Sequence, residues 1–569
     1  MKRRMKIVLP IAFSLTFLLG CGDLNLNPLS EGSSEAWFSS QTEVEMAVND
    51  LYRIVFWTSD VRPGWNYLEL TDDYSERITR DLLNGQFNSE SGVVVQNWKL
   101  LYRAVARANS ILERIDKAQD QLTDEQLNRY KAEARFARAS MYSKLISYWG
   151  DVVFYTETMD IDEAFSVGRT DKATILEAIY ADYDYAIVNL PNNSSEGRAT
   201  KGAALALKAR IALYNEDWTI ARDAAEACID LGTYSLHPDY GELFLSSTKS
   251  SPEFIFTIPR STQLNSVIDR WTVQGRISRN SGGYGSENPS WELFCSYLCT
   301  DGLPIDESPL FNPHEPFKNR DPRCTETIVE FGSPHLGFIY QPHPDSLETL
   351  NLSTGNYQYN HDTRANKIFA SYNGLLWRKG VDEEWIDDYT AENSYIEIRY
   401  ADVLLMYAEA KTELGEIDQT VLDAVNSIRA RAYKVSVTQT ASYPAVNTMD
   451  QNKLMKLIRL ERRVELAAEG PRYMDIIRWK LAEKVLTTPM YGMLDVAELR
   501  SKIVNQGLWF FPETPPLDED GIADFSLMFN QGLIKIIAQR DFDPTRNYLW
   551  PIPATEILIN ENINQNPNY

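Results

Sequence analysis

Glu461 and Glu465 stand one helical turn apart, the spacing at which two carboxylates share one face of a helix. Paired carboxylates are the machinery of glycoside hydrolases, in which one group is the acid and the other the base or nucleophile. Arg459 and Arg463 follow the same spacing in the same segment. Because opposite charges one turn apart attract each other, we interpret the pattern as a structural ion network rather than a hydrolytic site.

No other residues have the spacing of a known catalytic motif or of a set of metal ligands. The five histidines are scattered, and the sequence contains no Ser/His or Cys/His nucleophile motif. Cys295 and Cys299 would share a helix face, but no second Cys or His pair follows to complete a zinc site. We expect no catalysis, no cofactor and no metal site, and the sequence leaves open whether a structural cation is bound. The sequence leaves the disulfide state of four cysteines open: Cys228, Cys295, Cys299 and Cys324.

The N-terminus has the pattern of an export signal. A cluster of Lys and Arg at positions 2–6 precedes an uncharged, mostly apolar run over residues 7–19, which is too short to cross a bilayer as a helix. The run ends at Gly20-Cys21, and this boundary resembles the lipobox of bacterial lipoproteins. We predict that residues 1–20 are removed and that Cys21 is acylated as a lipid anchor. An ordinary secretory signal with a free Cys21 thiol is the alternative.

Composition limits the classes of ligand. The formal net charge is −24, and it becomes more negative once the basic N-terminal residues are removed, so the surface repels phosphate backbones and nucleic acid is an unsuitable partner. Neutral ligands and cations stay open. The chain is rich in aromatic residues, with 30 Tyr and 13 Trp, whose flat apolar faces and polar handles are typical of binding surfaces.

Helical periodicity fills two blocks, at about residues 40–232 and 396–490. Thr123 and Gln126 form a capping-box pattern that launches a helix toward Tyr148. Closely spaced alanines predict tight helical hairpins of the tetratricopeptide type. We expect a mainly α fold in which irregular hairpins form a partial solenoid. The expected helices cover residues 96–119, 123–148, 172–190, 201–214 and 218–231, with a further hairpin over 400–432.

Residues 235–395 differ from the helical blocks. Gly, Ser, Asn, Pro and aromatic residues replace the helical period, and short apolar runs such as 254–258 predict isolated strands. Loops of this length are commonly functional or disordered, and the aromatic content argues against disorder. We therefore place the working surface in this loop-rich region. Residues 491–569 form an irregular C-terminal segment, and the whole of 21–569 is predicted to be one domain.

Ordered segments along the whole mature chain resemble the SusD/RagB family of outer-membrane lipoproteins from Bacteroidetes. They are residues 97–102, 107–109, 132–139, 148–151, 201–210, 301–302, 319–323, 398–410, 459–470, 478–479, 550–553 and 564–569. The resemblance implies a cell-surface lipoprotein that captures oligosaccharide or polysaccharide. It also implies a partner, a SusC-like TonB-dependent β-barrel transporter, over which the lipoprotein acts as a lid to deliver its ligand. Within these segments, we interpret 319–323 as a structural clasp and Trp98 and Trp149 as packing residues.

A glycan presents hydroxyls and apolar C–H faces, so its site needs exposed aromatic rings flanked by polar side chains. In the family the contacting residues vary with the glycan, so no motif transfers onto this sequence. Three clusters have the required composition. The first is Trp57, Trp65, Tyr67, Asp72, Asp73, Tyr74 and Arg77; the second is Trp271, Arg276, Asn280, Tyr284 and Trp291; the third is Arg364, Tyr372, Trp377 and Trp385.

Two other classes of function remain open at this point. A surface glycoside hydrolase could hide its two carboxylates among 80 acidic residues, because such pairs come from distant segments. A helical-repeat lipoprotein could instead bind a protein or peptide. The sequence does not specify which glycan or peptide is bound, or which side of the outer membrane the protein faces.

Overall fold

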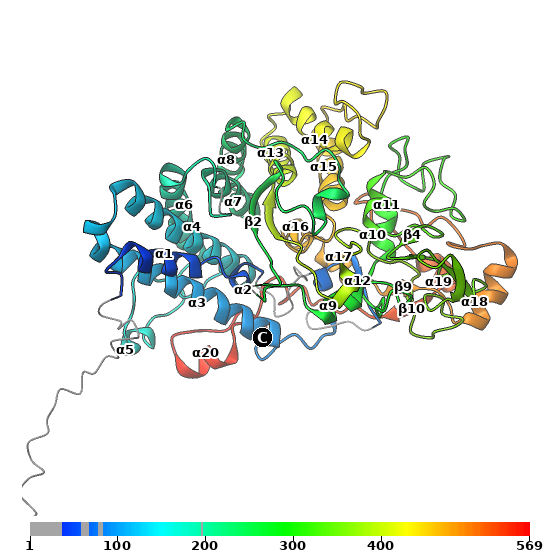
Figure 1. The fold of residues 1–569 in the computed structure, drawn as a ribbon, viewed down its shortest axis with the longest axis horizontal. Helices are drawn as coiled ribbons and strands as arrows, with labels where there is room; N and C mark the ends of the chain where they lie inside the picture. The colour runs from blue at the N-terminus through cyan, green and yellow to red at the C-terminus, as the bar shows by residue number, and fades with distance from the viewer. Residues whose placement is uncertain (1–36, 59–67, 78–82, 195–196, 264) are drawn as a thin grey trace, which may run out of the picture.

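The computed structural model describes residues 37–58, 68–77, 83–194, 197–263 and 265–569 (Figure 1). Cys21, Trp65 and Tyr67, three of the predicted site residues, therefore lie outside the described residues. The described part is mainly helical with a few short strands, which confirms the predicted fold class. No helix within it is long and apolar enough to cross a bilayer.

The first helical block contains the predicted helices, although the one expected over 96–119 begins at Gly92 and continues after Arg114 as a 3-10 helix. Thr123 caps α4 (Asp124–Trp149) through the predicted capping box, in which its side chain and that of Gln126 each accept the other residue's backbone N–H. Helix α4 packs against its neighbours α3 and α6. The other elements of this block are α1 (Gln41–Asp50), α2 (Ile54–Trp57), η1 (Leu68–Leu70), α3 (Gly92–Arg114), η3 (Ile115–Gln121), α5 (Ile161–Ala164) and α6 (Lys172–Asn189).

Alanine-rich hairpins join the two helical blocks into one stack. Helices α7 (Lys201–Tyr214) and α8 (Trp218–Asp230) pack against each other and bury most of their alanines. Helix α8 also packs on α13 (Tyr400–Glu413), which forms a hairpin with α14 (Gln419–Ala432). Figure 1 shows α7, α8 and α13 side by side although a long insertion separates α8 from α13 in sequence. The predicted partial solenoid is thus continuous. Its remaining helices are α15 (Gln451–Glu465), α16 (Pro471–Arg478) and α17 (Ala482–Val485).

The loop-rich region leaves and re-enters the solenoid at one place. Strand β2 (Phe254–Ile258), at the predicted position, pairs antiparallel with β8 (Tyr395–Arg399), so the ends of the insertion are held together. A four-stranded sheet lies inside the insertion, and its strands in order are β4 (Pro334–His335), β5 (Phe338–Ile339), β6 (Glu348–Asn351) and β7 (Asn356–Tyr359). The other elements of the loop-rich region are η4 (Glu242–Phe244), α9 (Arg270–Arg276), β3 (Asn288–Pro289), α10 (Trp291–Ser296), α11 (Arg323–Thr327) and α12 (Trp385–Asp388).

The C-terminal segment contributes to both parts of the molecule. Trp550 packs in the solenoid core against Tyr148 and Trp149, whereas Phe511 packs in the loop-region core against Trp291. Trp98 belongs to the same solenoid core, which confirms it and Trp149 as packing residues. The segment contains β9 (Met490–Gly492), α18 (Val496–Lys502), η5 (Val504–Gln506), α19 (Ser526–Asn530), β10 (Lys535–Ala538) and α20 (Ala554–Ile559).

Glu461 and Glu465 belong to a buried group of ion pairs, here called the central ion cluster. Each carboxylate binds arginines, as predicted, but the arginines come from other elements of the fold. Arg463 instead pairs with Asp72 and Asp73. The cluster joins helices α14 and α15, strand β8 and the 319–323 segment, which confirms that segment as a clasp. Its members are Glu253, Asp321, Arg323, Lys379, Arg399, Arg429, Arg431, Glu461, Glu465 and Glu469.

Candidate functional site

Three segments that are far apart in sequence meet at one place on the loop-rich region. Strand β1 (Tyr74–Ser75) pairs antiparallel with β3, which brings Arg77 beside the 284–288 loop. The guanidinium carbon of Arg77 lies 5.0 Å from the ring centroid of Phe369 and 6.0 Å from that of Tyr372. A narrow cleft lined by Arg77, Gly285, Phe369 and Tyr372 marks the junction. Residues from all three predicted clusters therefore contribute to one surface.

Exposed aromatic rings cover this surface. Trp271 is 75% exposed at the start of α9, where the Asp269 carboxylate accepts the Trp271 N–H and fixes the first turn. The ring of Tyr284 lies with its centroid 5.7 Å from that of Trp271, and Phe369 is 49% exposed. We call Trp271, Tyr284, Phe369 and Tyr372 the aromatic platform.

A tight loop holds Tyr284 against α9. The backbone N–H of Tyr284 donates to the Gln274 carbonyl and that of Gly285 donates to the Ile277 carbonyl, so the chain folds back along the helix. The loop needs Gly282, whose φ is +88°. The platform is thus presented by backbone hydrogen bonds rather than by a free loop.

Asp362 secures the start of the same loop from beneath. Its carboxylate accepts the Arg279 N–H at 2.6 Å and the Asn280 side-chain amide at 2.5 Å. Burial raises the pKa of Asp362 to about 6, although these hydrogen bonds favour its charged form. Asn280 also donates to the Asn360 side chain, so this predicted ligand contact supports the loop. Arg276, half-buried and 3.8 Å from Glu287, occupies a similar supporting position.

Several predicted site residues lie in the interior, and the expectation that they are exposed is wrong. Trp57, Trp291 and Trp377 are each at most 2% exposed. Trp57 stacks on Phe136, and Trp291 packs among phenylalanine rings. Large aromatic faces fill cores as readily as they line binding surfaces, so composition alone did not separate the two. Trp385, Tyr74 and Asp72 are buried as well.

The buried charged residues of the predicted clusters take part in ion pairs. Asp73 is fully covered and pairs with Arg463. Burial raises the pKa of Asp73, with Arg463 acting in the opposite direction. Arg364 pairs with Asp495 at 2.8 Å, and its guanidinium carbon lies 4.5 Å from the Tyr372 ring centroid. Arg364 therefore positions Tyr372 of the platform without facing solvent.

Sequence reasoning missed two residues of this surface, Phe369 and Arg279. Arg279 donates from Nε to the Phe369 carbonyl at 3.0 Å and so ties the 278–286 loop to the 369–372 segment. The available signal was the adjacent apolar pair Ile368-Phe369 in an otherwise polar stretch, and both side chains are exposed. Neither residue follows a periodic pattern, so only the tertiary structure places it.

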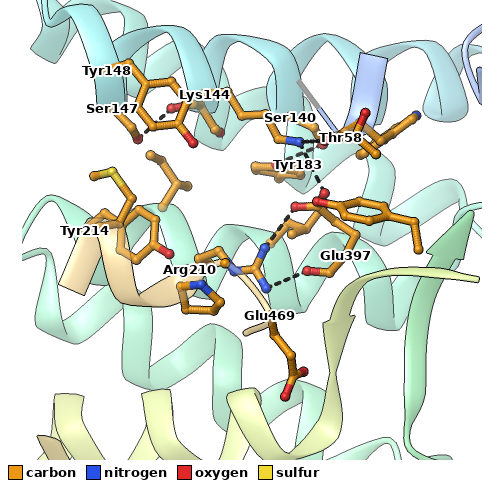
Figure 2. Close-up of a pocket in the computed structure, with 18 residues that line it drawn as sticks. Thr58, Ser140, Lys144, Ser147, Tyr148, Tyr183, Arg210, Tyr214, Glu397 and Glu469 are labelled. Carbon is orange, nitrogen blue, oxygen red and sulfur yellow. Dashed lines mark hydrogen bonds and ion pairs between the residues drawn. The ribbon is translucent and has the colours of Figure 1, made fainter. Parts of the chain in front are cut away.

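A second hollow lies inside the solenoid, between α4, α7, α16 and strand β8 (Figure 2). Lys144, Arg210 and Glu397 point into it, and Glu397 accepts from Arg210 at 2.9 Å and from Lys144 at 3.2 Å. Burial lowers the pKa of Lys144, opposed by Glu397. The interior volume is about 100 Å³, well below the several hundred that a small-ligand site needs. We interpret it as a small polar gap between packed helices, lined by paired charged side chains.

A third hollow, of about 700 Å³, lies between α3 and α20. Tyr102 and Tyr155 stack in parallel within it at a centroid distance of 6.2 Å, and Phe165 is 47% exposed at its edge. Its aromatic lining makes it the rival to the platform as a ligand site.

Comparisons with known proteins agree with this architecture. A family model described as "SusD family" matches residues 252–569, and one described as "Starch-binding associating with outer membrane" matches residues 62–213. SusD-like protein P25 of Formosa agariphila is 27% identical over 475 residues, covering 80% of this chain and 86% of that protein.

Solved structures extend the similarity to the fold. A SusD-like carbohydrate-binding protein from Bacteroides fragilis superposes with a TM-score of 0.75 at 29% identity, covering 93% of this chain and all of that one. A laminarin-binding SusD-like protein has a TM-score of 0.56 at 20% identity, covering 93% of this chain and all of that one, and shares the fold. Since one family model spans more than half of the sequence, this chain belongs to the SusD/RagB family.

Proposed function

We propose that this protein is a non-enzymatic, glycan-binding lipoprotein of the outer membrane. The observation that carries the proposal is the aromatic platform, on which Trp271, Tyr284 and Phe369 are exposed beside polar groups. Aromatic faces cover the C–H faces of sugars, and neighbouring donors and acceptors bind their hydroxyls. The description of the N-terminal family model, and the carbohydrate-binding and laminarin-binding relatives, support the same class of ligand.

The proposal extends to how the ligand is handled. Residues 1–20 act as a lipoprotein signal peptide, Cys21 is acylated, and residues 21–569 form a single unit held at the outer face of the outer membrane. The unit caps a SusC-like TonB-dependent transporter, holds the glycan against it and acts as a lid during uptake. Family membership supports this arrangement.

Calorimetric titration with a panel of oligosaccharides tests the binding site. Trp271→Ala combined with Tyr284→Ala removes two stacking faces, and we expect affinity for every bound glycan to fall about tenfold or more, which is about 1.4 kcal/mol. Phe165→Ala in the hollow between α3 and α20 is the matched control and should leave affinity unchanged. Loss of affinity in the control alone would move the site to that hollow.

Incubation of the protein with the same oligosaccharides, followed by a reducing-end assay, tests the class of function. Release of new reducing ends during incubation would identify a glycoside hydrolase and contradict the proposal. Failure of every glycan to bind, together with capture of a peptide, would instead favour a peptide-binding protein. Co-purification with a TonB-dependent barrel from outer membranes, lost when Cys21 is replaced by Ser, is the expected result for the transporter partnership and anchor.

A further inference from the structure

We propose that the aromatic platform takes an acidic glycan, one bearing uronate carboxylates or sulfate esters, and that Arg77 and Arg279 pair with its charges. The inference rests on the proposed function, because it specifies the ligand of the same site. Its basis is that Arg77 and Arg279 form no ion pair with any described carboxylate and lie next to the rings on which a sugar would stack.

Arg77 is exposed, and its contacts within the described residues are with rings. Its guanidinium lies beside Phe369 and Tyr372, and no described carboxylate is within ion-pair distance of it. A guanidinium held against aromatic faces is pre-oriented, and its outward N–H groups form the planar fork that matches a carboxylate or sulfate. Arg77 can therefore bind an anion at the edge of the platform without first breaking an ion pair with any residue that the structure describes.

Arg279 is the second arginine beside Phe369. It is half-buried, its Nε donates to the Phe369 carbonyl, and it forms no ion pair with a carboxylate in the described part of the chain. Burial lowers the pKa of Arg279, Asp362 opposes that shift, and the nearby charge of Arg77 adds to it. The positive charge of Arg279 is therefore only partly offset by Asp362, and a bound anion would offset the remainder.

Three described carboxylates near Arg77 and Arg279 are buried, and the exposed Asp495 is paired with Arg364 and Lys535, which both lie over the Tyr372 ring. Glu76 is 8% exposed and accepts the Tyr74 hydroxyl. Glu287 is equally buried and faces Arg276, while Asp362 is occupied by the N–H groups beneath the loop. These three carboxylates are buried, so within the described residues none of them neutralises the guanidinium groups of Arg77 and Arg279 beside Phe369.

The strongly negative chain does not argue against an anionic ligand at this place. The net charge of −24 is spread over a large protein, and salt screens charges beyond about 8 Å at physiological ionic strength. Two arginines at contact distance therefore dominate the field that a bound sugar experiences. The acidic remainder of the surface still disfavours nucleic acid, which needs an extended cationic face.

Matched pairs of probes test the charge preference by calorimetry. Oligogalacturonate is compared with its carboxyl-reduced form, and carrageenan oligosaccharide with its desulfated form, each at low and high NaCl. We expect at least one acidic probe to bind about tenfold more tightly than its neutral counterpart, and this preference to shrink at high salt. The uronate and sulfate arms distinguish the two sources of charge.

Variants locate the effect. Arg77→Gln should lower the acidic-to-neutral affinity ratio, and Arg77→Lys, which keeps the charge but loses the planar fork, should lower it less. Arg53→Gln is the control, because Arg53 is 57% exposed in the first helical block. Retention of the full ratio in Arg77→Gln and Arg279→Gln would overturn the assignment of these residues.

The outcomes separate this inference from the proposed function. Neutral probes that bind as tightly as acidic ones, through Trp271, would refute the acidic ligand and leave the glycan-binding function standing. If Trp271→Ala weakens no probe, or if no probe of either kind binds, both the function of the platform and the inference fail.

Discussion

Glu465→Gln removes one charge from the middle of the central ion cluster. The cluster has five carboxylates and five basic side chains that pair among themselves, so its formal charge is zero. Glu465 is fully buried and accepts from three arginines, Arg323, Arg399 and Arg431. Burial alone would raise the pKa of Glu465, but these arginines hold it well below its usual range.

The loss of stability in Glu465→Gln depends on which carboxylates still pair with the three arginines. Breaking a buried ion pair by neutralising one partner costs about 3–5 kcal/mol, because the other charge stays buried. Each of the three arginines keeps another carboxylate, for example Glu461 for Arg323 and Glu253 for Arg431. We therefore expect the lower end, a fall of about 3 kcal/mol in the free energy of unfolding.

Denaturant unfolding followed by tryptophan fluorescence measures this change. Glu416→Gln is the control, since Glu416 pairs with Arg222 on the surface and should cost less than about 1 kcal/mol. Adding Arg431→Met to Glu465→Gln restores a neutral cluster, so the double variant should be more stable than the two single changes predict when added. A loss below about 1 kcal/mol in Glu465→Gln, or strict additivity in the double variant, would refute the reasoning.

Three further predictions follow from individual contacts. The four cysteines after Cys21 are free and buried, and burial raises the pKa of each thiol, so none should react with a disulfide reagent until the protein is unfolded; labelling of the native protein would contradict this. Because burial raises the pKa of Asp362 from 3.8 to about 6, this group's contribution favours folding below about pH 4 and is lost as pH rises toward 6, by about 3 kcal/mol. Urea unfolding of wild type and Asp362→Asn across this range should therefore converge or cross, not stay parallel. Gly282→Ala places a Cβ against the Tyr389 hydroxyl at a φ of +88° and should weaken glycan binding by displacing Tyr284; Gly355→Ala, with a positive φ but open space, is the control and should leave affinity unchanged.

Patterns within single segments were enough to predict the solenoid. The capping box at Thr123, the alanine-rich hairpin of α7 and α8 and the strand at Phe254–Ile258 all depend on neighbours within a few residues or one turn. Such interactions depend on residues close in sequence, so they can be predicted without knowledge of the tertiary structure. Ordered segments along the chain likewise carry the resemblance to the SusD/RagB family, which the family model confirms.

The candidate site could be predicted from the sequence only in part. Sequence composition selected Trp271, Tyr284 and Arg77, but with equal reason it selected Trp57 and Trp291, which the structure buries. A tryptophan face is equally suitable for a core and for a sugar, and the difference lies in which segments cover it. That covering comes from distant residues, such as Phe511 over Trp291.

What the sequence by itself determined is therefore the helical architecture and the class of residue that the site requires. Only the tertiary structure decided that Arg77, Tyr284 and Phe369 share one surface, and that the partners of Glu465 come from other elements rather than from its own helix. The physical reason is range: hydrophobic period and capping act over a few residues, whereas burial and charge pairing depend on contacts that form only once the whole chain is folded.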